Sequence, residues 1–433
     1  WGLSKFENSV KSLFLISLFM FVGNTSGADG SGSESVLLLL RFIYPFVVLF
    51  FTIHFSVKQQ VKTMLSVQLR KAIFTLMIFF MVCLAVAMFS DYAMISIMKL
   101  VQFVYIVLIL SFTLWVIPVP FSKWTRFLSS VWIAVVIASI PFIILPGGYI
   151  GNNLFRGVLN HSQVLGPFLA IGLSILLPRV LKANVIKENI LFCIAVWILL
   201  ATQSRTAMLL VVTSQVITWC VMWIKSLSLG AKDCDHLFYW KKKEVMVKIL
   251  FVIIGIYLTV FVLWDALSEY AIQKLMKTDT VSSFSMEELN ESGLHSRSGQ
   301  IQSFKDAIVT HPLFGNGFGL PYGDMEIGNI SYIPGTSIPI GATVEVGFIM
   351  LALFAQIGIV GSFIFLYFLF LYLKPIFSEN SEVILLGITP LLSNFGEGTL
   401  FSPSTLLGMS TWFCLILCAV YRKKTVNSKV IIK

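Results

Sequence analysis

The sequence has 433 residues, of which 57% are hydrophobic and only 12% are charged, and its mean hydropathy is +0.89. Soluble domains carry about 25% charged residues, so this composition excludes an ordinary soluble globular protein. The net charge of +10 would suggest a nucleic-acid partner in a soluble chain. In a membrane protein it must first be compared with the distribution of charge between loops.

Apolar stretches recur along the whole chain, and a helix of about 20 such residues spans the hydrocarbon core of a bilayer. We therefore expect an all-α polytopic membrane protein. Its twelve candidate spans are residues 12–22, 36–56, 72–90, 94–117, 127–145, 163–178, 189–202, 206–224, 246–264, 344–373, 383–395 and 404–421. The stretch 344–373 is long, and Gly358 and Gly361 could divide it into an interfacial segment and a span. The expected organisation is spans one to nine in 1–264, a polar loop in 265–342, and spans ten to twelve with a tail in 343–433.

Basic residues are distributed unevenly between alternate loops. Most of the 31 lysines and arginines lie in loops that would share one side of the membrane, and the other set of loops, which includes the long polar loop, holds few. Cytoplasmic loops carry an excess of Lys and Arg, so we expect both termini in the cytoplasm and the long loop outside. The same asymmetry accounts for the net charge without a nucleic-acid partner.

The long polar loop contains the segment RSGQIQSFKDAIVTHPLFGNGFG, residues 297–319. It predicts a short polar helix from Arg297 to Thr310, which His311-Pro312 ends, and then a glycine-rich turn with Gly315 and Gly317. Proline ends a helix at the residue before it, and glycine allows close backbone approach to another segment or to a ligand. We expect the turn to pack the loop tightly against the helices. His311 is either a functional imidazole or a structural cap, and Phe314 and Phe318 either stack on a ligand or pack.

Two arginines of the outer loops are candidates for binding a diphosphate. Arg205 lies between two expected spans with no long loop around it, and Arg297 opens the predicted loop helix. A fixed guanidinium suits bidentate binding of phosphate groups. The alternative for each is a lipid phosphate or a structural carboxylate, and Arg156 is a less specific candidate of the same kind.

Arg41 and Lys99 lie inside expected spans, about two turns from the outer ends. An ionisable group in a span is a functional candidate, because its desolvation costs several kcal/mol unless it is paired or reaches water. The alternative is that both side chains extend to the outer headgroups.

Candidate proton acceptors also lie on the expected outer side. His161 stands at the mouth of the sixth span, where it is either a base or a hydrogen-bonded helix-start residue. Glu345 lies where the long loop re-enters the membrane, and it could act as a base or pair with an arginine. We expect Glu397 to be a solvated loop charge. The six cysteines form no CxxC pair or His/Cys cluster, so neither a disulfide framework nor a metal site is predicted.

Three motifs together resemble the bacterial O-antigen ligase and polymerase family of membrane glycosyltransferases. They are SRTAMLL after a mid-chain span, an arginine followed by HPLFGNGFG in a large outer loop, and a Gly-x-x-Gly span, here AQIGIVG. The resemblance implies a GT-C-like fold in the bacterial inner (plasma) membrane. It also implies an undecaprenyl-diphosphate-linked oligosaccharide donor bound from the periplasmic side, with no metal or nucleotide cofactor. By position, Arg205 and Arg297 would hold the diphosphate.

Ligases of this family carry a His-Asn pair before the Gly-x-x-Gly span, where this sequence has Gly347-Phe348, with Glu345 nearby. We therefore favour a polymerase, which extends one lipid-linked repeat unit with another and could work with a chain-length regulator. The alternatives are an O-antigen ligase, a protein O-oligosaccharyltransferase, and a transporter or flippase of lipid-linked glycan. The candidate catalytic residues are Arg205, Arg297, Glu345 and His161, and the candidate substrate-binding residues are Arg156, Arg41, Lys99, His311, Gly315 and Gly317.

Overall fold

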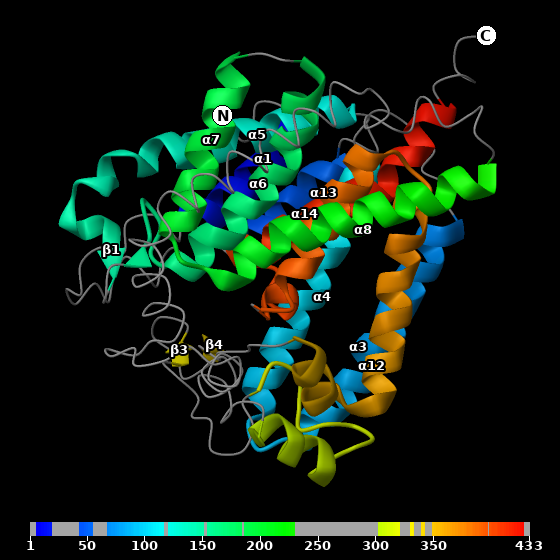
Figure 1. The fold of residues 1–433 in the computed structure, drawn as a ribbon. Helices are drawn as coiled ribbons and strands as arrows, with labels where there is room; N and C mark the ends of the chain where they lie inside the picture. Colours follow the sequence, from blue (N-terminus) through cyan, green and yellow to red (C-terminus); the bar gives the residue numbers. More distant parts are fainter. Residues whose placement is uncertain are drawn as a thin grey trace.

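The structure is a computed structural model that describes residues 6–19, 43–54, 67–116, 120–150, 154–183, 186–229, 302–320, 330–332, 339–342, 349–396 and 398–427. This part of the chain is a helical bundle with two short antiparallel strand pairs (Figure 1). The pairs are β1 (Tyr149–Ile150) with β2 (Leu154–Phe155), and β3 (Ile330–Tyr332) with β4 (Pro339–Ala342). The expectation of a helical protein is confirmed, and the strands lie in segments expected to be loops.

Six of the described helices are long and apolar enough to cross a membrane. They are α3 (Val67–Met88), α4 (Ala93–Val116), α5 (Phe121–Ser139), α6 (Ser162–Ala183), α8 (Arg205–Leu229) and α12 (Ile349–Ile376). Other helices occupy five of the other six expected positions, namely α1 (Phe6–Phe19), residues 43–54, α7 (Ile186–Ala201), α13 (Ser381–Ser393) and α14 (Leu406–Asn427). The remaining expected span, 246–264, lies outside the described residues. These helices are compatible with the expected multi-pass membrane protein, and the number twelve stays a prediction.

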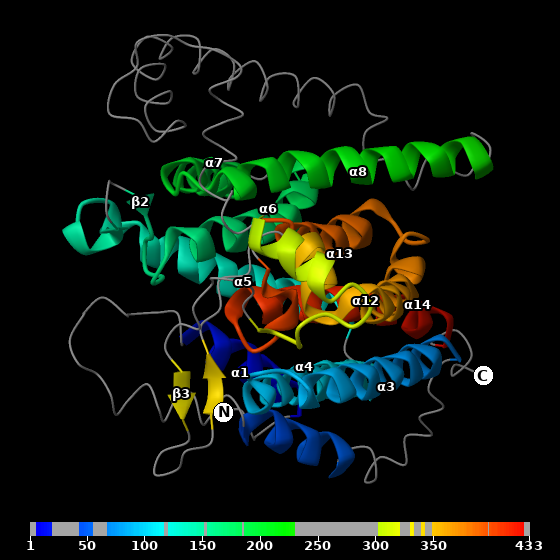
Figure 2. The same cartoon turned by 90° about the horizontal axis from the view of Figure 1, so that it is seen from below.

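The C-terminal helix α14 lies at the centre of the bundle. It packs against α1, α4, α6, α12 and α13, and its side chains from Leu406 to Cys418 are all buried. Figure 2 shows α7 and α8 along one side of the molecule and α3 and α4 along the opposite side, with α6, α13 and α14 between them. Large apolar side chains such as Phe74 of α3, Val212 of α8 and Phe363 of α12 stay exposed. Such an apolar surface suits contact with lipid chains.

The helix ends gather at two opposite ends of the bundle. At one end, the Lys225 Nζ donates to the carbonyl of Glu379 at 2.6 Å, and the rings of Phe121 and Tyr421 lie 4.7 Å apart. At the other end lie the start of α8 and the connection from α13 to α14, of which residues 394–396 and 398–405 are described. Figure 1 shows the segment 302–320 against the lower ends of α3 and α12, near the start of α4. The candidate residues that the structure describes lie at this second end.

Candidate functional site

Arg205 is the first residue of α8, and only residues 202–204 separate α8 from the end of α7. Gln203 has a φ of 53° in this tight connection. The Ser204 N–H donates to the Thr202 Oγ1 at 3.3 Å, and the Ser204 carbonyl accepts the first backbone hydrogen bond of α8, from Met208, at 3.1 Å. The predicted corner between two helices, with no long loop around its arginine, is confirmed.

Two glycines allow neighbouring segments to approach this corner closely. Gly166 of α6 lies against Ser204, and a Cβ at position 166 would come within 2.6 Å of the Ser204 Cβ. Gly396, after α13, lies against the side chain of Thr206, and a Cβ there would overlap it. The residues on either side of Arg205 are therefore held between α6 and the segment after α13. Sequence reasoning did not single out either glycine, because an isolated glycine does not show which segment it faces.

The position of Arg205 gives it a defined electrostatic environment. Its side chain is half-buried, and the first turn of a helix directs backbone N–H groups outward and carries partial positive charge. A cation at this end of a helix is disfavoured by the helix dipole, whereas an anion bound there would interact favourably with both the guanidinium and the N–H groups. Chemically, the corner is suited to an anion such as a phosphate.

The second part of the site is the break in α12. Gly358 has φ 62° and ψ −172°, so α12 consists of two helical segments joined there, as the sequence predicted. The N–H of Ile359 donates to the carbonyl of Pro312 at 2.9 Å, and the N–H of Val360 donates to the carbonyl of Leu313 at 3.2 Å. In a continuous helix these N–H groups would bond to Ala355 and Gln356.

The glycine-rich turn binds the two carbonyls that the break leaves without helical donors. The N–H of Asn316 donates to the carbonyl of Ala355, and the N–H of Gly317 donates to that of Gln356, both at 3.0 Å. A Cβ on Gly315 would overlap the backbone of Gln356. The expectation that the turn packs the loop against the helices agrees with this geometry, in which Gly315 and Gly317 contact protein backbone.

Side chains of α4 hold the next residues of the turn. The Ser96 Oγ donates to the carbonyl of Phe318 at 3.0 Å, and the Lys99 Nζ donates to that of Gly319 at 2.8 Å. Lys99 therefore does not extend to the outer headgroups. Its ammonium group has a partner inside the protein, which lowers the cost of placing it within a span.

Phe318 packs and is not available for stacking on a ligand. Only 1% of its surface is exposed, and its ring lies 5.5 Å from Phe103 and 4.9 Å from Phe401. Phe401 belongs to the connection between α13 and α14, which also holds Gly396 beside Thr206. This segment links the glycine turn to the Arg205 corner. Phe314, in contrast, is 53% exposed.

Three other candidates make structural contacts. The His161 Nδ1 accepts the N–H of Gln163 at 3.1 Å, which is the helix-start role considered for it. The Arg156 Nε donates to the carbonyl of Gly147 at 2.9 Å within the loop before α6. His311 is exposed, and its carbonyl accepts the N–H of Gly315 at 2.9 Å, so its backbone joins the end of helix 302–310 to the turn.

Arg297, Arg41, Glu345 and Glu397 lie outside the described residues, and the structure does not test their predicted roles. The described portion of helix 297–310, residues 302–310, is helical as predicted and ends before His311-Pro312. Within the described ranges, no group of three or more His, Cys, Asp or Glu side chains is arranged to hold a metal ion.

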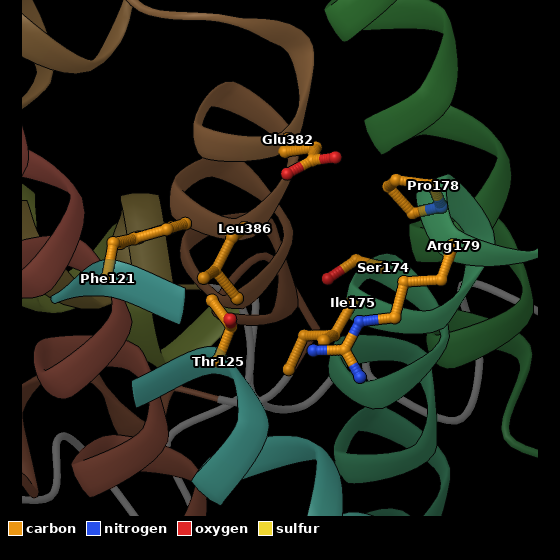
Figure 3. A pocket seen from close by; sticks show the side chains of 8 residues that line it. All are labelled: Phe121, Thr125, Ser174, Ile175, Pro178, Arg179, Glu382 and Leu386. Atoms are coloured by element: carbon orange, nitrogen blue, oxygen red, sulfur yellow. The ribbon is translucent and has the colours of Figure 1, made fainter. Parts of the chain in front are cut away.

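A small cavity lies at the opposite end of the bundle, between α5, α6 and α13 (Figure 3). Arg179 and Glu382 line it, and the Arg179 Nη1 donates to the Ser129 Oγ at 3.0 Å. The cavity volume is about 40 Å³, which is room for a few water molecules and not for a sugar. We therefore assign the candidate site to the Arg205 end of the bundle.

The sequence was compared with models of protein families and with curated proteins, and it matches none of them.

Proposed function

We propose that this protein is a metal-independent glycosyltransferase that polymerises polysaccharide repeat units carried on undecaprenyl diphosphate. The observation that carries the proposal is Arg205, which is half-buried at the first turn of α8 between two close glycine contacts. The motifs SRTAMLL, HPLFGNGFG and AQIGIVG support the same assignment by their resemblance to the O-antigen ligase and polymerase family.

In the proposed orientation, the Arg205 end of the bundle faces the periplasm, and both termini lie in the cytoplasm of a bacterium with the protein in its inner membrane. The uneven distribution of basic residues between alternate loops supports this orientation. The donor would then reach the site from the outer leaflet, with membrane lipid around the bundle and a chain-length regulator as a further partner.

In the proposed reaction, a hydroxyl of the acceptor sugar attacks the anomeric carbon of the donor. The bond from this carbon to the diphosphate oxygen breaks, and the lipid diphosphate leaves with the bonding electron pair. Arg205, together with Arg297, stabilises the charge that develops on the leaving group. Such stabilisation acts strongly where water is partly excluded.

The acceptor proton goes to Glu345 or to His161. The tautomer of His161 whose Nδ1 accepts the N–H of Gln163 carries its hydrogen on the Nε2. If His161 is the base, the Nδ1 therefore takes the proton, and its hydrogen bond from Gln163 is lost. The sequence Gly347-Phe348 at the position of the ligase His-Asn pair favours polymerase over ligase.

Deletion of the chain separates these two activities. Loss of a polymerase leaves a single repeat unit on the acceptor in an electrophoretic banding pattern, and loss of a ligase leaves no attached polymer. Loss of a transporter would instead cause lipid-linked units to accumulate on the cytoplasmic side.

The site is tested by complementing the deletion strain with arginine variants. We expect Arg205→Ala and Arg297→Ala to abolish polysaccharide chain extension, while each variant protein is present in the membrane at its normal abundance. The matched control is Arg179→Ala, which removes an arginine at the opposite end of the bundle and should restore long chains. Long chains from Arg205→Ala would contradict the proposal.

A further inference from the structure

Gln356 is a fully buried amide side chain in the membrane-spanning helix α12. Its Oε1 accepts the N–H of Gly319 at 3.1 Å, and its backbone carbonyl accepts that of Gly317. Its Nε2 is buried, and no hydrogen-bond partner for it is found among the described residues. An amide that is only partly hydrogen-bonded costs more in an apolar interior than an aliphatic side chain of similar size. The hydrogen bond with Gly319 is one that a leucine at position 356 could not make.

Lys99 contacts the same peptide region from the other side. Its Nζ donates to the carbonyl of Gly319, whose N–H donates to Gln356. A Cβ on Gly319 would come within 2.7 Å of the Lys99 Cδ, and the φ of Gly319 is +72°. Polar side chains from two different helices, α4 and α12, therefore bind the N–H and the carbonyl of one residue.

The helix before the turn depends on this attachment for its own position. Phe304 and Ala307 of helix 302–310 are buried against Ala352 and Ala355, in the segment of α12 before the break. The opposite face of this helix is exposed, and it includes Gln302, whose Nε2 donates to the Asp306 Oδ1 at 2.9 Å. A small apolar contact of this kind stabilises the helix much less than burial in the main core.

We propose that Gln356 and Lys99 are positioning residues, which fix the glycine turn and the adjoining helix 302–310 in the orientation that the transfer site requires. The inference deepens the proposed function and rests on it, because Arg297 lies shortly before this helix in the chain. The two residues hold Gly319 and do not touch the reacting atoms. Their effect on the reaction runs through the placement of the loop.

The experiment measures attachment of the helix directly, by labelling a cysteine with a maleimide in detergent. The parent chain carries Ala307→Cys, at a position that is 4% exposed, and has alanine at the cysteine positions 193, 220 and 234. The buried Cys83, Cys414 and Cys418 are kept, since their labelling reports general unfolding.

Gln356→Leu and Lys99→Met are expected to raise the labelling rate at position 307 by about tenfold, as the loss of one hydrogen bond would. Labelling of Cys414 and Cys418 should not change, and Lys99→Arg should restore a rate near that of the parent. The matched control is Gln302→Leu, which removes an exposed amide from the same helix and should leave labelling unchanged. Equal labelling in all variants would overturn the proposal, as would a parallel rise at the buried cysteines.

The same variants distinguish this inference from the proposed function. If both the inference and the proposed function hold, Gln356→Leu shortens the polysaccharide although the protein is present in the membrane at its normal abundance. The Lys99→Arg variant then makes longer polysaccharide than Lys99→Met. If Arg205→Ala leaves chain extension intact while Gln356→Leu still raises labelling, the proposed function is wrong and the attachment by Gln356 stands.

Discussion

Gly358 of α12 lies directly against the carbonyl of Leu313, so closely that a Cβ at position 358 would overlap it. Gly358 belongs to a helix and Leu313 to a loop, and the two residues are 45 positions apart in the sequence (358 minus 313). Around this contact, two carbonyls of α12 before the break and two N–H groups after it hydrogen-bond to the loop. The loop segment 311–320 is therefore a structural part of the bundle.

Gly358→Ala is expected to destabilise the protein strongly. The combination of φ 62° and ψ −172° belongs to a region that essentially only glycine adopts, and an alanine held there costs about 1–3 kcal/mol. Its Cβ would also displace Leu313. The melting temperature in detergent should fall by several degrees. Gly147→Ala is the control, since a Cβ at position 147 meets no atom within 4 Å. Equal stability of the two variants would show that the break does not require glycine.

Gly396→Ala is expected to reduce chain extension without removing any charged group. The new methyl group overlaps Thr206, so the corner that carries Arg205 must shift. A displacement of about 1 Å in a site can lower the rate about a hundredfold. The measurement is polysaccharide length at matched membrane abundance.

The second variant for this contact is Gly396→Ala combined with Thr206→Ala. It removes the Oγ1 and Cγ2 atoms that the new methyl group meets, and it should recover part of the length. Strictly additive losses in the double variant would argue against a steric cause.

Arg205→Lys is expected to give an intermediate defect, between wild type and Arg205→Ala. Lysine keeps the positive charge but loses the planar fork that binds two phosphate oxygens at once. Loss of one stabilising donor lowers kcat by about 10²–10³-fold, so the lysine variant should lose less than this. The rates are compared with purified lipid-linked donor. A lysine variant as fast as wild type would show that charge alone is sufficient.

Phe318→Ala and Phe314→Ala separate packing from ligand contact. Phe318 is buried among aromatic rings, and its truncation should cost about 3–5 kcal/mol of stability. Phe314 is 53% exposed, so its truncation should leave the melting temperature unchanged. A loss of chain extension in Phe314→Ala alone would indicate that this ring contacts substrate. A normal melting temperature for Phe318→Ala would contradict the packing described for it.

Much of the local structure was predictable because it depends on neighbouring residues. Runs of apolar residues form helices whether lipid or protein surrounds them, since every backbone group must be hydrogen-bonded within the segment. Pro312 ends helix 302–310, and Gly358 breaks α12, through backbone properties that each residue carries with it. The tight corner at Arg205 likewise followed from the short distance between two helices.

The tertiary structure alone decided which faces meet. In a membrane helix the side that faces lipid is as apolar as the side that faces protein, so hydrophobicity does not distinguish them. For this reason the sequence did not show that α14 is central, or that Gly166 and Gly396 face the Arg205 corner. The partners of Lys99 and Gln356 were hidden for a related reason. A buried polar group must find a hydrogen-bonding partner, but that partner can lie anywhere in the chain, and here both residues bind Gly319, more than thirty positions from either.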